Sequence, residues 1–255
     1  MGERLRHRVA LISGGATGVG GAASRLFASE GARVAILDIN AAEAERTAQQ
    51  VRDAGGQALV VVADVSRAAA VEQAVAQVVQ QWGTIDVLFN HAGSIVVKPF
   101  LETTEDDWDH LMAVNVKSMY LVTRAVLPHM LVKGRGAIVC TSSISAVAAT
   151  PGEVLYDTTK GACHMFARAI AVEYRDRGIR CNAVCPGFIR TPHGLREVDA
   201  LQKMGVDVSD AAMAAAQGRM CEPEEVAAAA LFLVSDEASF VNGAQLFVDN
   251  GFTAV

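Results

Sequence analysis

Ser143, Tyr156 and Lys160 are the side chains in this sequence whose types and spacing could transfer a proton. Tyr156 and Lys160 begin and end the segment YDTTK, and residues four apart on a helix lie on one face. A phenol has a pKa of about 10, and lowering that pKa by three units with a neighbouring ammonium group needs roughly 4 kcal/mol. The serine hydroxyl could bind the same substrate oxygen. Taken alone, a Tyr–Lys pair at this spacing is typical of a helix surface, so its interpretation depends on the rest of the chain.

A glycine-rich turn follows the first strand candidate and leads into a helical stretch. Glycines let the backbone turn tightly and approach a pyrophosphate, and the start of a helix favours its negative charge. Between a strand and a helix, this pattern predicts a dinucleotide site in preference to a purely structural turn. The turn reads Ser13-Gly14-Gly15-Ala16-Thr17-Gly18-Val19-Gly20.

Asp38 ends the second strand candidate, downstream of Gly20. A carboxylate there can accept hydrogen bonds from ribose hydroxyls and would repel a 2′-phosphate. Its expected neighbours, Thr17 and Ile39, supply no cation for such a phosphate, so NAD is predicted in preference to NADP. A strand-end carboxylate can instead cap the next helix, and Asp64, after the third strand, has the same two interpretations.

Short apolar runs alternate with alanine-rich helical stretches along most of the chain. Nearly continuous apolar runs are expected of parallel strands covered on both faces. The alternation predicts a single α/β domain over residues 1–255, with a doubly wound sheet and ligands at the carboxyl ends of its strands. The predicted strands are Val9–Ile12, Arg33–Leu37, Ala58–Val62, Val87–Asn90, Ala137–Cys140, Arg180–Val184 and Gln245–Val248. The predicted helices include Ala41–Ala54, Arg67–Trp82, Glu105–Leu131, Tyr156–Asp176 and Pro223–Val234. Thr104 is the predicted N-terminal cap of the helix at 105–131.

Residues 191–221 interrupt this alternation, because they contain no obvious strand and mix glycines with apolar and charged residues. A long insertion between the sixth and seventh strands is a candidate lid over a substrate. Its apolar side chains either line a pocket or pack the lid onto the body. These side chains are Leu195, Leu201, Met204 and Met213.

The composition is that of a folded chain without a strongly charged surface. Net charge is −6 with both signs interspersed, which argues against a nucleic-acid partner. The sequence has no long apolar span and no secretory pattern, so we expect a cytoplasmic protein without a membrane segment. The five cysteines lack metal-site spacing, and Cys181 and Cys185 lie in a strand-like run, which predicts buried thiols and no metal ligand.

Several motifs in order resemble those of the short-chain dehydrogenase/reductase family, in its shorter single-domain branch, over residues 9–251. The glycine turn is similar to the family's TGxxxGxG, with Ser13 in place of the threonine. The segment NHAG resembles NNAG, with His91 replacing the second asparagine. The other matching residues are Asp64-Val65, Asn90, Ala92, Gly93, Asn115, Ser143, Tyr156 and Lys160 of YxxxK, and Pro186, Gly187, Ile189 and Thr191 of PGxxxT.

The resemblance implies a Rossmann three-layer sandwich around a mostly seven-stranded parallel sheet, and an NAD-dependent oxidoreductase that interconverts a secondary alcohol and its ketone. It implies that the glycine turn, Asp38, and the Asp64-Val65, NHAG and PGxxxT segments contact the cofactor. Tyr156 would transfer the proton and Ser143 would hold the substrate oxygen. Lys160 would lower the Tyr156 pKa and bind the nicotinamide ribose, and Asn115 would hold a water that links Lys160 to solvent.

Two departures from the family pattern leave this implication in place. His91 is expected to be a structural hydrogen-bonding group that preserves the cofactor floor. In YDTTK, Thr159 differs from the common YxASK form and could still face the cofactor.

The expected substrate pocket is predominantly apolar, and no Arg or Lys cluster marks a substrate phosphate or carboxylate. A hydrophobic cyclic, aromatic or steroid-like alcohol is therefore favoured, with small polyols left open. His193, at the mouth of the lid, either contacts the substrate or lies at the surface, and Glu153 is expected to be an exposed loop carboxylate. Besides Ser143 and Tyr156, the expected pocket residues are Ile95, Val96, Val147, Phe188 and the lid methionines.

Other functions stay open. A 3-oxoacyl thioester reductase would commonly prefer NADPH, which Asp38 opposes. A sugar-nucleotide epimerase would usually need a longer chain. A non-catalytic NAD-sensing protein would not need the intact Ser143, Tyr156 and Lys160 set. The family resemblance also implies a homotetramer, with the helices at 105–131 and 156–176 in one interface.

Overall fold

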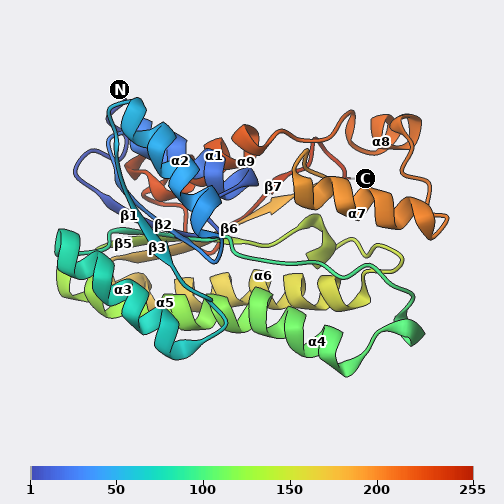
Figure 1. The fold of residues 1–255 in the computed structure, drawn as a ribbon, viewed down its shortest axis with the longest axis horizontal. Helices are drawn as coiled ribbons and strands as arrows, with labels where there is room; N and C mark the ends of the chain where they lie inside the picture. Colours follow the sequence, from blue (N-terminus) through green and yellow to red (C-terminus); the bar gives the residue numbers. More distant parts are fainter. Residues whose placement is uncertain (1, 255) are drawn as a thin grey trace.

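The computed structural model describes residues 2–254, which form a parallel seven-stranded sheet with helices on both faces (Figure 1). The strand order is β3-β2-β1-β4-β5-β6-β7. The strands are β1 Val9–Ser13, β2 Arg33–Asp38, β3 Gln57–Val62, β4 Val87–Asn90, β5 Gly136–Thr141, β6 Ile179–Pro186 and β7 Gln245–Val248. The α-helices are α1 Gly18–Ser29, α2 Ala41–Asp53, α3 Ala68–Trp82, α4 Glu105–Leu111, α5 Ser118–Lys133, α6 Val154–Tyr174, α7 Pro192–Lys203, α8 Asp210–Gln217 and α9 Pro223–Val234.

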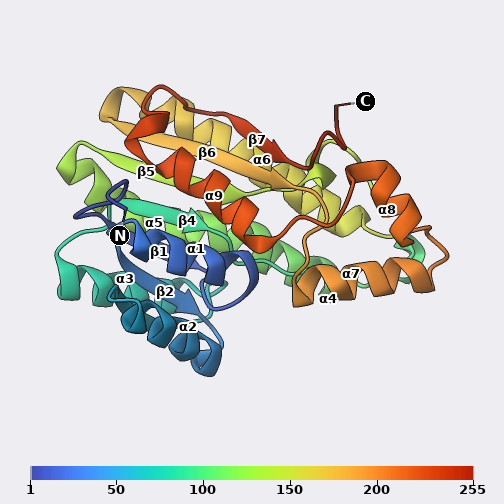
Figure 2. The ribbon, with the colours of Figure 1, turned by 90° about the horizontal axis from the view of Figure 1, so that it is seen from above.

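Helices α1, α2 and α9 cover one face of the sheet and α3, α5 and α6 cover the other, so the predicted three layers are confirmed (Figures 1 and 2). Each strand contributes to two cores because successive side chains point to opposite faces. In β1, Val9 and Leu11 pack into the core on the α3–α5 side, and Ala10 and Ile12 into the core on the α1–α9 side. This explains the continuous apolar runs. None of the helices in residues 2–254 has the length and apolar character needed to cross a membrane.

The winding of the chain reverses beside β1, which pairs with β2 on one side and with β4 on the other. Loops leaving the carboxyl ends of β1 and β4 therefore diverge and leave a crevice, the place where doubly wound sheets bind ligands. Ser13 pairs with Asn90 in this register, so the glycine turn and the NHAG segment start side by side.

The long helix predicted from Glu105 to Leu131 is interrupted. Helix α4 begins with the expected cap, a capping box between Thr104 and Asp107. A π-helical stretch, Met112–Lys117, then separates α4 from α5. Asn115, 1 % exposed, lies in this stretch, and its amide pairs with the backbone of Ser94. A π-turn widens the helix locally, a distortion that helical periodicity does not predict.

Residues 191–221, here called the lid segment, leave the sheet after β6 and contain α7 and α8, which project beyond the sheet (Figure 2). Thr191 caps α7 by accepting the N–H of Gly194 at 3.0 Å. The segment returns to the body at Cys221, which forms a parallel bridge with Ile189. Leu201 is fully buried, so at least part of the apolar surface of the segment packs the lid onto the body.

Candidate active site

A cavity of about 500 Å³ opens at the carboxyl end of the sheet, between the glycine turn and α7. It brings together most of the predicted site residues, although they come from the carboxyl ends of six strands and from α6. Those in its wall are Gly14, Thr17, Gly18, Val19, Asp38, Asp64, Val65, Ala92, Gly93, Ser143, Tyr156, Lys160, Pro186, Gly187, Phe188, Ile189 and Thr191. Ser13, Gly20, Asn90, Ile95 and Asn115 lie outside the wall.

The glycine turn depends on backbone shapes that other residues adopt poorly. Gly14 and Gly18 have φ of 67° and 52°, in the left-handed region. A Cβ on Gly20 would lie 1.9 Å from the carbonyl oxygen of Gly14, so Gly20 packs α1 against the turn and does not itself line the cavity. A glycine-rich turn at the start of α1 lets the backbone approach the pyrophosphate of a dinucleotide.

Asp38 connects the glycine turn to β2. Its carboxylate accepts the N–H of Ala16 at 3.1 Å and the N–H of Asn40 at 3.0 Å. Helix α2 is capped by the side chain of Asn40, which accepts from Glu43 at 3.2 Å. Direct capping by Asp38 is therefore excluded, and its carboxylate lies in the cavity wall where a ribose would be recognised.

Asp64, like Asp38, lines the cavity. Ser66 donates to its carboxylate from the backbone at 2.9 Å and from the hydroxyl at 2.7 Å. These hydrogen bonds hold the Asp64 pKa below its ordinary value, so the group is ionised at neutral pH.

Ser13 and Asn90 support the wall from behind and do not form it. Each is 3 % exposed. The Ser13 hydroxyl accepts the N–H groups of His91 and Ala92 at 3.1 and 3.3 Å, and the Asn90 amide donates to Thr123 Oγ1 at 2.8 Å. The expected direct cofactor contact of these two side chains is replaced by a scaffold for the NHAG segment.

His91 is a structural hydrogen-bonding group, as expected. Its Nδ1 lies 3.0 Å from Thr141 Oγ1, and its ring is tilted against Phe89 with centroids 5.2 Å apart. Burial, followed by the charge of Lys160, lowers the His91 pKa to about 3, so the imidazole is neutral. A neutral ring beside Lys160 leaves the cavity floor intact.

Tyr156 and Lys160 point to the cavity from the first two turns of α6. The Lys160 Nζ lies 5.3 Å from the centre of the Tyr156 ring and donates to the Thr141 carbonyl at 3.1 Å. Ser143 follows β5, its hydroxyl donates to Ser145 Oγ at 3.0 Å, and it lines the cavity together with Tyr156 and Lys160. The three predicted side chains therefore meet at one end of the cavity.

The pKa of Tyr156 is shifted in the direction opposite to the expectation. Burial raises it well above its ordinary value, and the carboxylates of Glu197 and Glu153 raise it further, while the hydrogen bond of Ser143 lowers it. Burial also lowers the Lys160 pKa. The phenol is thus protonated at neutral pH, the form that donates a proton.

Asn115 lies just behind the wall, and Thr159 holds it there. The Asn115 amide donates to the Ser94 carbonyl and to Thr159 Oγ1, both at 2.9 Å, and its oxygen accepts the Ser94 N–H at 2.7 Å. Thr159 is 1 % exposed and donates to the Tyr156 carbonyl at 2.7 Å. The expectation that Thr159 could face the cofactor is therefore wrong, because its hydroxyl positions Asn115.

The substrate end of the cavity differs most from expectation. Glu153, expected to be exposed, is 1 % exposed and lies close enough to Glu197 and Tyr156 to influence their charges. His193 and Glu197, one helical turn apart on α7, both line the cavity. Sequence reasoning missed Glu197, since only the tertiary fold brings α7 and α6 to one cavity.

The apolar residues predicted for the substrate pocket are mostly not those that line the cavity. Phe188 lines it, whereas Ile95, Val96, Val147 and the lid residues Leu195, Leu201, Met204 and Met213 lie outside it. Leu201 and Met213 are buried, and the Met204 methyl would lie 2.6 Å from a Cβ on Gly152. Leu201, Met204 and Met213 therefore pack the segment onto the body, whereas Leu195 is 50 % exposed, and other apolar residues, among them Val114, Ile144 and Ile189, line the cavity.

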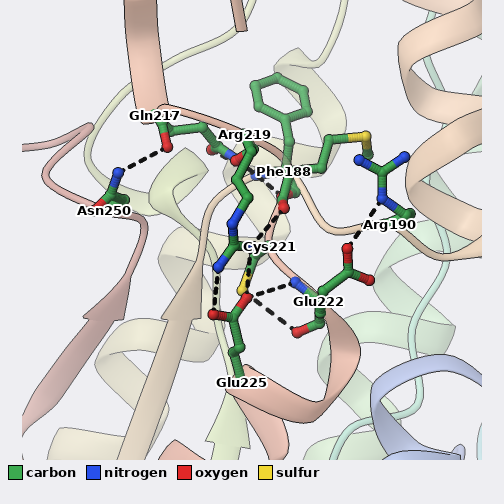
Figure 3. A network of polar contacts seen from close by, with 9 residues as sticks. Phe188, Arg190, Gln217, Arg219, Cys221, Glu222, Glu225 and Asn250 are labelled. Atoms are coloured by element: carbon green, nitrogen blue, oxygen red, sulfur yellow. Dashed lines mark hydrogen bonds and ion pairs between the residues drawn. The ribbon is translucent and has the colours of Figure 1, made fainter. Parts of the chain in front are cut away.

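Phe188 is held by a hydrogen-bonded network that ties the lid segment to the end of β6 (Figure 3). The Gln217 side chain, 2 % exposed, accepts the Phe188 N–H at 3.0 Å and donates to the carbonyls of Phe188 and Arg219 at 2.9 and 2.8 Å. Ion pairs Arg190–Glu222 and Arg219–Glu225 flank it. Sequence patterns did not indicate Gln217.

Comparison with known proteins agrees with this geometry. The family described as enoyl-(acyl carrier protein) reductase matches residues 14–253. The chain is 38 % identical over 251 residues to a cyclopentanol dehydrogenase of Comamonas sp. (strain NCIMB 9872), covering 98 % of this chain and 99 % of the relative. It is 36 % identical over 254 residues to a 2,5-dichloro-2,5-cyclohexadiene-1,4-diol dehydrogenase of Sphingobium indicum, covering 99 % of each. The crystal structure of levodione reductase superposes with a TM-score of 0.94 at 31 % identity, covering 98 % of this chain and 99 % of that one. The chain belongs to the short-chain dehydrogenase/reductase family.

Proposed function

We propose that this protein is an NAD-dependent oxidoreductase that interconverts a cyclic secondary alcohol and its ketone. The observation that carries the proposal is the meeting of Ser143, Tyr156 and Lys160 in a cavity that also contains the glycine turn. A proton-transfer group and a dinucleotide cradle in one cavity suit hydride-transfer chemistry. The relatives named for cyclopentanol and for a cyclohexadiene diol support a ring alcohol as the substrate.

The cavity residues have separable tasks in this reaction. A bound nicotinamide cofactor would supply the hydride acceptor or donor. The hydroxyls of Ser143 and Tyr156 bind the substrate oxygen. Tyr156 gives its proton to that oxygen when a ketone is reduced and takes a proton from it when an alcohol is oxidised. Lys160 is held at the Thr141 carbonyl beside the phenol, where its positive charge opposes the nearby carboxylates.

NAD is proposed in preference to NADP because of Asp38. The carboxylate is fixed by Ala16 and Asn40 at the ribose end of the cavity, where it can accept from ribose hydroxyls and would repel a 2′-phosphate. Ile39, the next residue, is 71 % exposed and carries no charge. Replacement of Asp38 by asparagine should therefore shift the ratio of kcat/KM values toward NADP.

A 3-oxoacyl thioester reductase is the second candidate, and the description of the matching family favours it. Such a substrate would need a long open channel and, in the expected pattern, NADPH. Asp38 and the polar substrate end weigh against it. Activity with a 3-oxoacyl thioester and NADPH that exceeds activity with ring alcohols would establish this candidate instead.

Assembly into a homotetramer is also proposed. Met119 on α5 is buried within the chain, and Phe166 on α6 packs against the same core. Other apolar side chains on α5 and α6 face outward: Tyr120, Met165 and Val172 are 48 %, 58 % and 65 % exposed. Sedimentation of a monomer at micromolar concentration would contradict the proposal.

The test of the function is an initial-rate panel with NAD and NADP on cyclic, aromatic, steroid and polyol secondary alcohols. We expect turnover of ring alcohols with NAD. A clear NADP preference would overturn the role of Asp38. NAD binding without turnover of any alcohol would contradict the oxidoreductase and favour a protein that senses the cofactor.

A further inference from the structure

The substrate end of the cavity has an excess of carboxyl groups. Glu197, on α7, is half-buried in the cavity wall. Glu153 lies behind it at the start of α6, and Asp157 follows one turn later. The three carboxyls are close enough to disfavour one another's charge, and those of Glu153 and Glu197 also act on Tyr156. Of the three, Glu197 lines the cavity itself.

Glu153 is the most unusual member of this group. It is 1 % exposed, and neither carboxyl oxygen has a hydrogen-bond partner among the described residues. Glu153 occupies the position before α6 where a side chain commonly caps the helix, yet within residues 2–254 its carboxyl caps no N–H group. A buried polar group without a partner is costly. Its carboxyl instead lies toward Glu197 and Tyr156.

Among the described residues, Arg196 and His193 also line the cavity, yet no hydrogen bond joins either of them to Glu197 or Glu153. Lys160 donates to the Thr141 carbonyl, and the Thr150 N–H donates to Asp157 at 3.2 Å. For Glu197, nearby charges shift the pKa, and no side-chain hydrogen bond contributes in the part of the chain that the structure describes. A ligand that brings its own hydrogen-bond donor would satisfy this acceptor.

We propose that Glu197, backed by Glu153, binds a second hydrogen-bond donor on the substrate, a ring hydroxyl or an ammonium group. This inference rests on the proposed function, since it requires the reacting oxygen to be held by Ser143 and Tyr156. A ring whose reacting carbon lies at Tyr156 would place a substituent on its far side against α7. Glu197 is then a specificity-determining residue, and Glu153 is the buried carboxyl behind it.

The protonation of the pair suits this role. Burial, followed by the charges of Glu197 and Asp157, raises the Glu153 pKa to about 9. Burial raises the Glu197 pKa to about 7, against the effect of Lys160. Near neutral pH Glu153 is therefore protonated while a large fraction of Glu197 is ionised. An ionised acceptor makes the stronger hydrogen bond to a hydroxyl or ammonium donor.

The test compares substrates of nearly equal shape. Wild-type protein and the variants Glu197→Leu and Glu197→Gln are assayed with trans-1,4-cyclohexanediol, 4-aminocyclohexanol and 4-methylcyclohexanol. We expect the wild type to prefer a donor-bearing ring, and Glu197→Leu to lower that preference about tenfold to a hundredfold, chiefly through KM. The matched control is Asp199→Leu, because Asp199 lies on the exposed face of α7 and pairs with Lys203.

The two variants and the two donors separate the outcomes. Glu197→Gln keeps an acceptor oxygen, so it should retain more of a preference for the diol than for the amine. An unchanged ratio of diol to 4-methylcyclohexanol kcat/KM in folded Glu197→Leu would overturn the inference while the oxidoreductase function stands. Failure of the wild type to oxidise any of the three rings, with NAD bound, would contradict the function and the inference together.

Discussion

The nucleotide end and the substrate end of this cavity are built in different ways. At the nucleotide end, neighbouring residues of one strand–turn–helix unit form most of the site, and the backbone at Gly14 and Gly18 forms the cradle. At the substrate end, side chains from α6, α7 and the loop after β6 meet only because the lid segment packs over them. The first end is fixed by local backbone geometry and the second by tertiary packing.

The strongest test of the nucleotide end is Gly20→Ala. The added methyl carbon would lie 1.9 Å from the Gly14 carbonyl oxygen, so the turn must move. Overpacking of this kind typically costs about 1–3 kcal/mol, which corresponds to roughly a tenfold to hundredfold weaker affinity for NAD. Isothermal titration calorimetry measures the affinity for NAD.

Gly161→Ala is the matched control, since a Cβ at Gly161 meets nothing within 4 Å. It should bind NAD as the wild type does. Equal NAD affinity in Gly20→Ala and in the control would contradict the steric account of the turn.

At the substrate end, Gln217→Leu should raise KM for the alcohol severalfold while changing the affinity for NAD much less. The substitution removes the hydrogen bonds to both backbone groups of Phe188 and to the Arg219 carbonyl. Leaving such groups unpaired costs about 1–3 kcal/mol each, so Tm should also fall. Gln202→Leu, the same change on the exposed face of α7, is the control. A KM that does not move would show that Phe188 needs no such support.

Thr159→Val tests the link between the two ends. It keeps the side-chain shape but removes the acceptor for the Asn115 amide, and we expect a loss of about 1–2 kcal/mol in unfolding free energy with a severalfold lower kcat. Thr158→Val is the control, because Thr158 is exposed and its hydroxyl bonds only the Val154 carbonyl among the described residues. If both variants behave alike, Thr159 has no special role in positioning Asn115.

The smallest expected effect is on the pH dependence of kcat. Burial and the carboxylates of Glu197 and Glu153 raise the Tyr156 pKa, so the phenolate that oxidation requires becomes more abundant as pH rises. Alcohol oxidation should therefore speed up between about pH 7 and 9, while ketone reduction should change little, because the phenol stays protonated over this range. Glu197→Gln removes one of these charges and should move the oxidation profile to lower pH. A profile that moves to higher pH would contradict the electrostatic argument.

This contrast also explains what could be predicted from the sequence. The strands, the glycine turn, Asp38 and the Tyr156–Lys160 pair depend on local periodicity and spacing, and the structure places them as expected. The π-helical stretch at Asn115 was not predictable from helical periodicity, and neither were the hydrogen bonds that Asn115 forms with Ser94.

The substrate end was predicted least well for the same reason. Glu153 looks like a loop carboxylate in the sequence, yet in the fold it is 1 % exposed. The lid side chains Leu201 and Met213 were candidates for the pocket, yet they serve the packing of the segment itself. Hydrophobicity identifies which residues are buried, but it does not distinguish a side chain that packs the lid from one that faces a substrate.

The measurement that tests the account most directly is a paired comparison of wild type and Tyr156→Phe: NAD affinity by calorimetry and single-turnover oxidation of a ring alcohol. We predict that the variant binds NAD within a few-fold of the wild type, while the rate of oxidation falls by about a hundredfold or more, as expected when a proton-transfer group is removed. Near-normal oxidation by Tyr156→Phe would contradict the assignment of proton transfer to Tyr156, and with it the central claim.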